Sequence, residues 1–160
     1  MAHIRTYKEL EEIEPAEAEW KLIHACKHRD VCVLGDGELP PAPEDGAAPD
    51  PEREIRAALL RYLLLGGCKT FQTDDVGVWL AGAHITGTLD LDFTTVRGPM
   101  RLLSCRFEQR LYMEQTFVAQ FGLDGSHLNG LRAQGLNCKG SVYLRNVSST
   151  GTVDVNSAEI

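Results

Sequence analysis

The sequence predicts a mainly β protein built as a solenoid, in which short strands stack in successive turns around one core. Apolar or small residues recur at relative positions 0, 2, 5 and 7, and this spacing repeats eight times between Val78 and Ile160. The units begin 11, 11, 11, 10, 10, 11 and 11 residues apart, which is close to a fixed period. Glycines such as Gly82, Gly87 and Gly98 follow the central positions, where they favour turns with positive φ. A regular array of strands and corners is therefore expected.

Divided at its second position, the repeat becomes one of about five residues. The clearest matches are the segments 94–98 (TTVRG) and 87–91 (GTLDL). This pattern resembles the pentapeptide-repeat family. The resemblance implies a right-handed quadrilateral parallel β-helix, here of about four coils. The alternative is an all-β sandwich, which also has short strands at intervals of about 8–12 residues, but a sandwich rarely keeps one register through so many units.

A quadrilateral coil of two units places outward residues 21 or 22 positions apart on top of one another. Four outward ladders are therefore expected on the four faces: Trp79-Arg101-Gly122-Tyr143, His84-Arg106-His127-Ser148, Asp90-Tyr112-Arg132-Asp154 and Thr95-Phe117-Asn137-Glu159.

The N-terminal part, residues 1–75, is predicted to be a helical capping region in front of the array at 76–160. One helix is expected from Leu10 to His28, followed by a strand-like run from Val31 to Leu34. A Pro-, Asp- and Ala-rich exposed loop follows at 38–51. A second helix should begin at Pro51 and end at the glycines 66–67, and it would cover the open end of the solenoid. The array ends on a core position at residue 160, and we expect it to continue in a longer protein.

Charge and composition restrict the classes of partner. The net charge is −7, but residues 76–160 carry seven acidic and seven basic side chains, which argues against nucleic-acid binding. The same balance argues against the DNA mimicry that some pentapeptide-repeat proteins show. No run approaches the ~20 apolar residues of a membrane span, so a membrane contact of this segment is not expected. The N-terminus lacks the apolar core of a signal peptide, which favours a cytoplasmic location with reduced cysteines.

Several clusters of reactive residue types do not have the spacing of a known site. His24, Cys26, His28 and Cys32 are close in sequence, but the spacing is not that of a zinc site. Cys68 follows the second helix without a neighbour that would activate it. We therefore predict no catalytic residues, no metal site and no cofactor.

Two further arrangements on the array are also interpreted as surface features. His84 and His127 flank Arg106 in a ladder that would suit an anion. Asp90, Asp92 and Glu114 are expected on one face, but glycosidase-like pairs of carboxylates need a groove built by long loops. Units of 10 or 11 residues leave no room for such loops.

The candidate functional residues are instead outward-facing side chains that a partner would contact. They are Trp79, Arg101, Tyr112, Phe117 and Tyr143. The leading hypothesis is a non-enzymatic scaffold that binds another protein or a second copy of itself, end to end or face to face.

The alternative function is a structural module of a longer enzyme whose chemistry lies outside this chain. The segments 55–67 (IRAALLRYLLLGG) and 77–91 (GVWLAGAHITGTLDL) are similar to bacterial proteins loosely labelled membrane-associated oxidoreductases. The residues themselves contain no dinucleotide-binding fingerprint, since Gly35-Asp36-Gly37 lacks the third glycine and a following helix.

Overall fold

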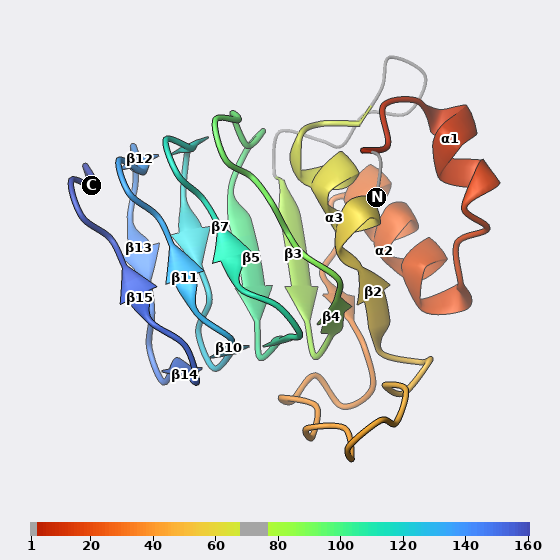
Figure 1. The fold of residues 1–160 in the computed structure, drawn as a ribbon. Helices are drawn as coiled ribbons and strands as arrows, with labels where there is room; N and C mark the ends of the chain where they lie inside the picture. The colour runs from red at the N-terminus through yellow and green to blue at the C-terminus, as the bar shows by residue number, and fades with distance from the viewer. Residues whose placement is uncertain (1–2, 68–76) are drawn as a thin grey trace.

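A computed structural model describes residues 3–67 and 77–160 and confirms the predicted fold class. The chain forms a parallel β-solenoid of about four turns, with helices packed at its N-terminal end (Figure 1). The predicted boundary at residues 75 and 76, like Cys68, lies outside the described residues.

Short strands make up the solenoid. They are β3 (Val78–Ala81), β4 (His84–Thr86), β5 (Met100–Leu103), β6 (Arg106–Phe107), β7 (Leu111–Tyr112), β8 (Phe117–Val118), β9 (Phe121–Gly122), β10 (His127–Leu128), β11 (Leu131–Arg132), β12 (Asn137–Cys138), β13 (Val142–Tyr143), β14 (Ser148–Ser149) and β15 (Val153–Asp154). Two further strands, β1 (Cys32–Val33) and β2 (Glu54–Arg56), come before them in the chain.

All described strand pairs are parallel and form four sheets, one on each face of the solenoid. The first face has the order β1-β3-β5-β9-β13, and the second has the order β14-β10-β6-β4-β2. The third face contains β15-β11-β7 and the fourth β12-β8. The backbone registers, with three isolated bridges, join the residues of all four predicted ladders. The 21- or 22-residue coil predicted from the sequence is therefore confirmed.

The inward positions of the units form one apolar core. Leu80, Leu102 and Leu123 lie at equivalent places in three successive coils and have no exposed surface. Burial of this kind contributes about 1.5–3 kcal/mol for each such side chain. Toward the C-terminal end the same positions become accessible, and Leu144 and Val155 are each more than 40% exposed.

Inward hydroxyl groups connect successive coils. The Oγ atom of the fully buried Ser126 donates to the carbonyl of Leu102 at 2.9 Å and accepts the N–H of Cys105 at 3.0 Å. Thr116 makes a similar bond to the carbonyl of Leu91 at 2.7 Å. These bonds satisfy backbone groups that lie away from water.

The Ser126 bonds can be tested by substitution. We expect Ser126→Ala to lower the free energy of unfolding by about 1–2 kcal/mol, because two buried backbone groups lose their partner. The exposed Ser141 provides the matched control, and Ser141→Ala should change stability by less than about 0.5 kcal/mol. Urea unfolding monitored by circular dichroism measures both. Equal effects of the two substitutions would contradict this role of Ser126.

One corner of every unit has a left-handed backbone, and glycine occupies only some of these corners. The eight positions are Gly82, Phe93, Ser104, Gln115, Gly125, Gly135, Asn146 and Ser157. The prediction that glycines mark the corners is thus confirmed for three of them. Elsewhere the corner is imposed by the stacked coils, even on Phe93, although a bulky residue is unfavourable there.

The first predicted helix is wrong in its extent, because the structure divides it into α1 (Tyr7–Glu12) and α2 (Glu17–His28). The break lies at Glu14, which has a φ of 50°, and at Pro15, which has no N–H to donate. The buried face of α2 also differs from the prediction. It contains Ala18, Leu22, Ile23 and Cys26, whereas Ala16 is exposed.

The second predicted helix begins later than expected. Residues before it form β2, and the helix α3 runs from Ala57 to Leu64. The cause is tertiary, because Ile55 pairs with Ile85 of β4 and faces the core as a strand residue. The predicted end is confirmed: Gly66 and Gly67 both have positive φ, and the N–H of Gly67 bonds to the carbonyl of Tyr62 at 2.9 Å.

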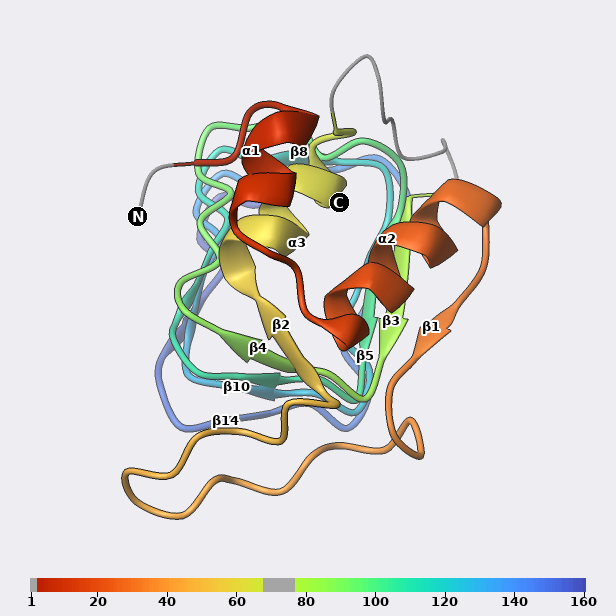
Figure 2. The same cartoon turned by 90° about the vertical axis from the view of Figure 1, so that its right-hand side faces the viewer.

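The N-terminal segment is thus part of the solenoid as well as its cover. β1 extends the first face beside β3, and β2 extends the second face beside β4. The three helices lie across the end of the coil, as the view along its axis shows (Figure 2). The described helices lack the length and apolar character that crossing a bilayer requires.

A buried ion pair attaches α2 to this first coil. Glu19 is 2% exposed and its carboxylate contacts the Arg56 guanidinium at 2.8 Å. It also accepts the backbone N–H groups of Ala16 and Arg56, each at 3.0 Å. One carboxylate therefore joins α2, the turn before it and the junction of β2 with α3.

Candidate protein-binding face

The outward side of the first face is the surface with the most aromatic and cationic contacts. Its strands, β1, β3, β5, β9 and β13, are in register, so outward side chains stand in rows across it. We call this surface the Trp79 face. Three of the five predicted interface residues, Trp79, Arg101 and Tyr143, lie on it.

Arginine side chains stack on both aromatic rings of the Trp79 face. The guanidinium of Arg101 lies over the Trp79 ring at 4.9 Å from its centroid, and that of Arg145 lies over Tyr143 at 5.7 Å. Cation–π pairs of this kind contribute about 0.5–1 kcal/mol at exposed sites. The contacts hold four long side chains flat along the sheet, so little side-chain entropy would be lost on binding.

The strand β1 adds apolar residues that sequence reasoning did not place on this surface. Val31 and Val33 point outward and are 38% and 47% exposed. The register of Cys32 with Leu80 places them beside Trp79 and Ala81. The alternation of Val31 to Leu34 indicated a half-buried strand, but nothing in the sequence showed that this strand pairs with β3.

The two arginines differ in their electrostatic surroundings. Arg145 is paired with Asp124 at 2.8 Å, and the Arg145 N–H and guanidinium lower the pKa of that carboxyl group. Arg101 donates to the neutral amide of Gln120 at 3.0 Å, and it has no carboxylate partner among the described residues. The Trp79 face therefore presents one cation that is not neutralised.

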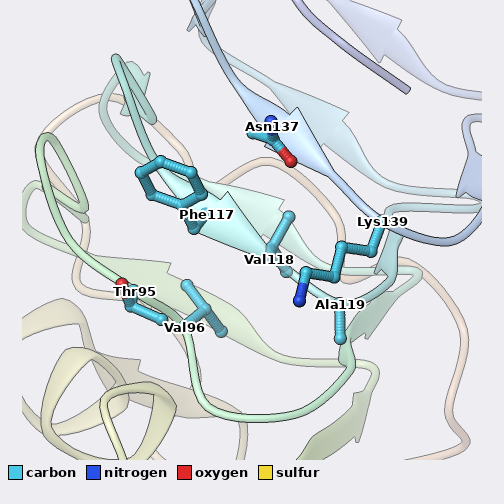
Figure 3. A pocket seen from close by; sticks show the side chains of 7 residues that line it. All are labelled: Thr95, Val96, Phe117, Val118, Ala119, Asn137 and Lys139. Carbon is cyan, nitrogen blue, oxygen red and sulfur yellow. The ribbon is translucent and has the colours of Figure 1, made fainter.

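The other two predicted interface residues lie on different faces. Tyr112 is on β7 of the third face, between Asp90 and Arg132. Phe117 is on β8 of the fourth face and is 53% exposed. It borders an open hollow of about 470 Å³, with Val96, Val118, Ala119 and Lys139 among the other residues that line it (Figure 3). The five residues therefore do not form one surface.

The histidine ladder lies on the second face, where the 38–51 loop partly covers it. His84 is 5% exposed, and burial lowers its pKa. The Arg106 Nε atom donates to the carbonyl of Pro40 at 2.8 Å, so this arginine is directed to the loop. His127 bonds through Nδ1 to the Ser148 Oγ at 2.7 Å. These groups have protein partners, and they do not converge on an open site.

The carboxylates of the third face are also used within the fold. The Asp92 Oδ1 atom accepts the N–H of Glu114 at 2.7 Å, and Glu114 pairs with Arg132 at the same distance. Burial raises the pKa of Asp92. Within residues 3–67 and 77–160, no three metal-binding side chains lie close enough together to hold an ion.

The buried cysteines have the properties of core residues. Burial raises the pKa of Cys26 to about 12, that of Cys105 to about 12 and that of Cys32 to about 11. A thiol that stays protonated at neutral pH is a poor nucleophile and a poor metal ligand. The cluster of His24, Cys26, His28 and Cys32 thus contains two cysteines that face the core.

Comparison with known proteins leaves the geometry to stand alone. No family model, curated protein or solved structure matches the chain. The functional conclusion consequently depends on the surface itself.

Proposed function

We propose that this chain is a non-enzymatic, cytoplasmic scaffold of the pentapeptide-repeat type whose Trp79 face binds another protein. The observation that carries the proposal is the stacking of Trp79 on Arg101 and Tyr143 on Arg145 across one sheet, beside exposed Val31 and Val33. Aromatic residues and arginine are the side chains enriched at the energetic centres of protein interfaces. Four of the buried-thiol cysteines are unpaired, which agrees with a reducing compartment.

Interior strands of the Trp79 face have both edges paired, so a partner cannot add a strand in the middle of it. Recognition would rest on side chains: apolar contact with Trp79 and the valines, and hydrogen bonds to the arginines. Removing an aromatic anchor at the centre of such an interface costs about 2 kcal/mol or more, which is about a 30-fold loss of affinity.

Site-specific photo-cross-linking in the native cells tests this function. A benzoylphenylalanine at Val33 should yield a discrete adduct with one protein, and the adduct should disappear when Trp79→Ala is added. The same cross-linker at Asn129, an exposed residue of the second face, is the control and should give no such adduct. Identical adducts from both positions, or an adduct from Val33 that Trp79→Ala leaves unchanged, would refute binding through this face.

A further inference from the structure

One glycine on the Trp79 face has no structural reason to be a glycine. Gly122 lies in β9, between Arg101 and Tyr143 in the outward ladder. Its φ is not positive, unlike that of most glycines in the described part of the chain. A Cβ atom added there would meet its nearest neighbours, in Tyr143 and the Met100 carbonyl, at 3.8–4.0 Å, which is ordinary van der Waals contact.

This combination is unique among the described glycines for which a Cβ position was built. The others either have positive φ or, like Gly140 and Gly151, would bring a Cβ within 3.0 Å of backbone atoms. A glycine inside a strand weakens it, since it has no side chain to pack and loses more entropy on folding. Such a glycine often marks a place where another molecule approaches the backbone closely.

The missing side chain leaves a hollow of about 180 Å³, which we call the Gly122 hollow. Its lining includes Arg101, Gln120, Asp124, Tyr143 and Arg145. The Tyr143 ring forms one wall and the Arg101 side chain the opposite one, because these residues are the register neighbours of Gly122. The hollow thus combines an aromatic wall with two guanidinium groups.

The charges in the hollow select the chemistry of its occupant. The carboxylate of Asp124 already neutralises Arg145. Arg101 bonds only to the neutral Gln120 side chain, which leaves guanidinium N–H groups without an acceptor at the edge of the hollow. Guanidinium groups bind carboxylates in a planar two-bond geometry, and such charge-assisted bonds are about twice as strong as neutral ones.

We propose that the Gly122 hollow receives a carboxylate side chain from an acidic segment of the partner protein, which bonds to Arg101. This inference rests on the proposed function, because it assigns the partner's chemistry at the Trp79 face. The glycine keeps the hollow open for the acidic side chain, while Trp79 holds the Arg101 guanidinium beside it. Affinity should decrease as salt concentration rises, since the key contact is an ion pair near the surface.

The test uses a fluorescein-labelled copolymer of glutamate and tyrosine as an acidic probe, with a copolymer of lysine and tyrosine as the control. Fluorescence anisotropy with the full chain should show binding of the acidic copolymer only. Gly122→Val fills the hollow, and we expect it to weaken binding about tenfold or more while the melting temperature does not fall. Arg101→Gln should weaken binding to a similar extent. Lys139→Gln, a loss of the same charge on the fourth face, should change affinity less than about twofold.

Three results would overturn the inference. The first is unchanged affinity of the Gly122→Val protein. The second is an equal loss for Arg101→Gln and Lys139→Gln, which would indicate attraction by overall charge. The third is a lower melting temperature for both Gly122→Val and Gly122→Ala, because the glycine would then be needed for packing against Tyr143.

The partner adduct separates this inference from the proposed function. If the Val33 cross-link forms undiminished in the Gly122→Val protein, the Trp79 face binds a partner without using the hollow, and only the inference fails. If the wild-type protein gives no Trp79-dependent adduct, the proposed function fails. A dimer in sedimentation velocity that Gly122→Val dissociates would identify a second copy as the occupant and refute a separate acidic partner.

Discussion

Leu102→Asp will prevent folding of the solenoid or cause it to aggregate. Leu102 has no exposed surface and lies at the centre of β5, between the core positions of the coils on either side. A carboxylate there would be buried without a partner, at a cost of about 5 kcal/mol or more, comparable to the total stability of many domains. Far-UV circular dichroism and size-exclusion chromatography of the purified protein measure the loss.

The adjacent residue provides a matched control for this substitution. Leu103 follows in the same strand, faces outward on the Trp79 face and is partly exposed. Leu103→Asp makes the same chemical change one residue away, and we expect a folded protein whose stability changes by about 1 kcal/mol or less. If both variants unfolded, the inward and outward positions of β5 would be wrongly assigned.

Glu19→Ala will destabilise the protein by about 2–4 kcal/mol, the second largest effect that we expect. The substitution leaves the Arg56 guanidinium without its ion pair and removes the acceptor of two backbone N–H groups. Removal of one partner from a fully buried pair costs about 3–5 kcal/mol, and the lower range applies here because Arg56 is 32% exposed and solvent screens it. The midpoint of urea unfolding measures the change.

Glu17 is the control for this second prediction, because it is an exposed acidic residue in the first turn of the same helix. Glu17→Ala should cost less than about 1 kcal/mol, mainly through the helix dipole. A double-mutant cycle with Arg56→Ala should give a coupling energy of about 1 kcal/mol or more between residues 19 and 56. Equal losses for Glu17→Ala and Glu19→Ala would show that the ion pair does not hold α2 in place.

The sequence was sufficient to predict the repeating part of the fold down to individual ladders. The ladder from Trp79 through Arg101 and Gly122 to Tyr143 could be predicted because stacking in a solenoid is set by the length of the coil. That length is visible as the spacing between apolar residues. Local periodicity and tertiary neighbourhood therefore carry the same information in this part of the chain.

The N-terminal segment does not repeat, and there the sequence was a poorer guide. Ile55 has the spacing of a helix residue relative to Leu59, yet it is a strand residue because it pairs with Ile85. Its conformation depends on a contact across about 30 positions of the chain, and a local pattern contains no record of such a contact. The division between α1 and α2 was more accessible, since Pro15 was a visible break.

The candidate site divides in the same way. The sequence alone determined which residues face outward and which of them stack, because both follow from a period of 10 or 11 residues. Only the tertiary structure decided that β1 brings Val31 and Val33 beside Trp79, that Asp124 neutralises Arg145 but not Arg101, and that Gly122 lies at a place with room for a side chain. The reason is physical: a repeat sets the positions of backbone atoms, whereas charge pairing and open space depend on how side chains from distant segments meet.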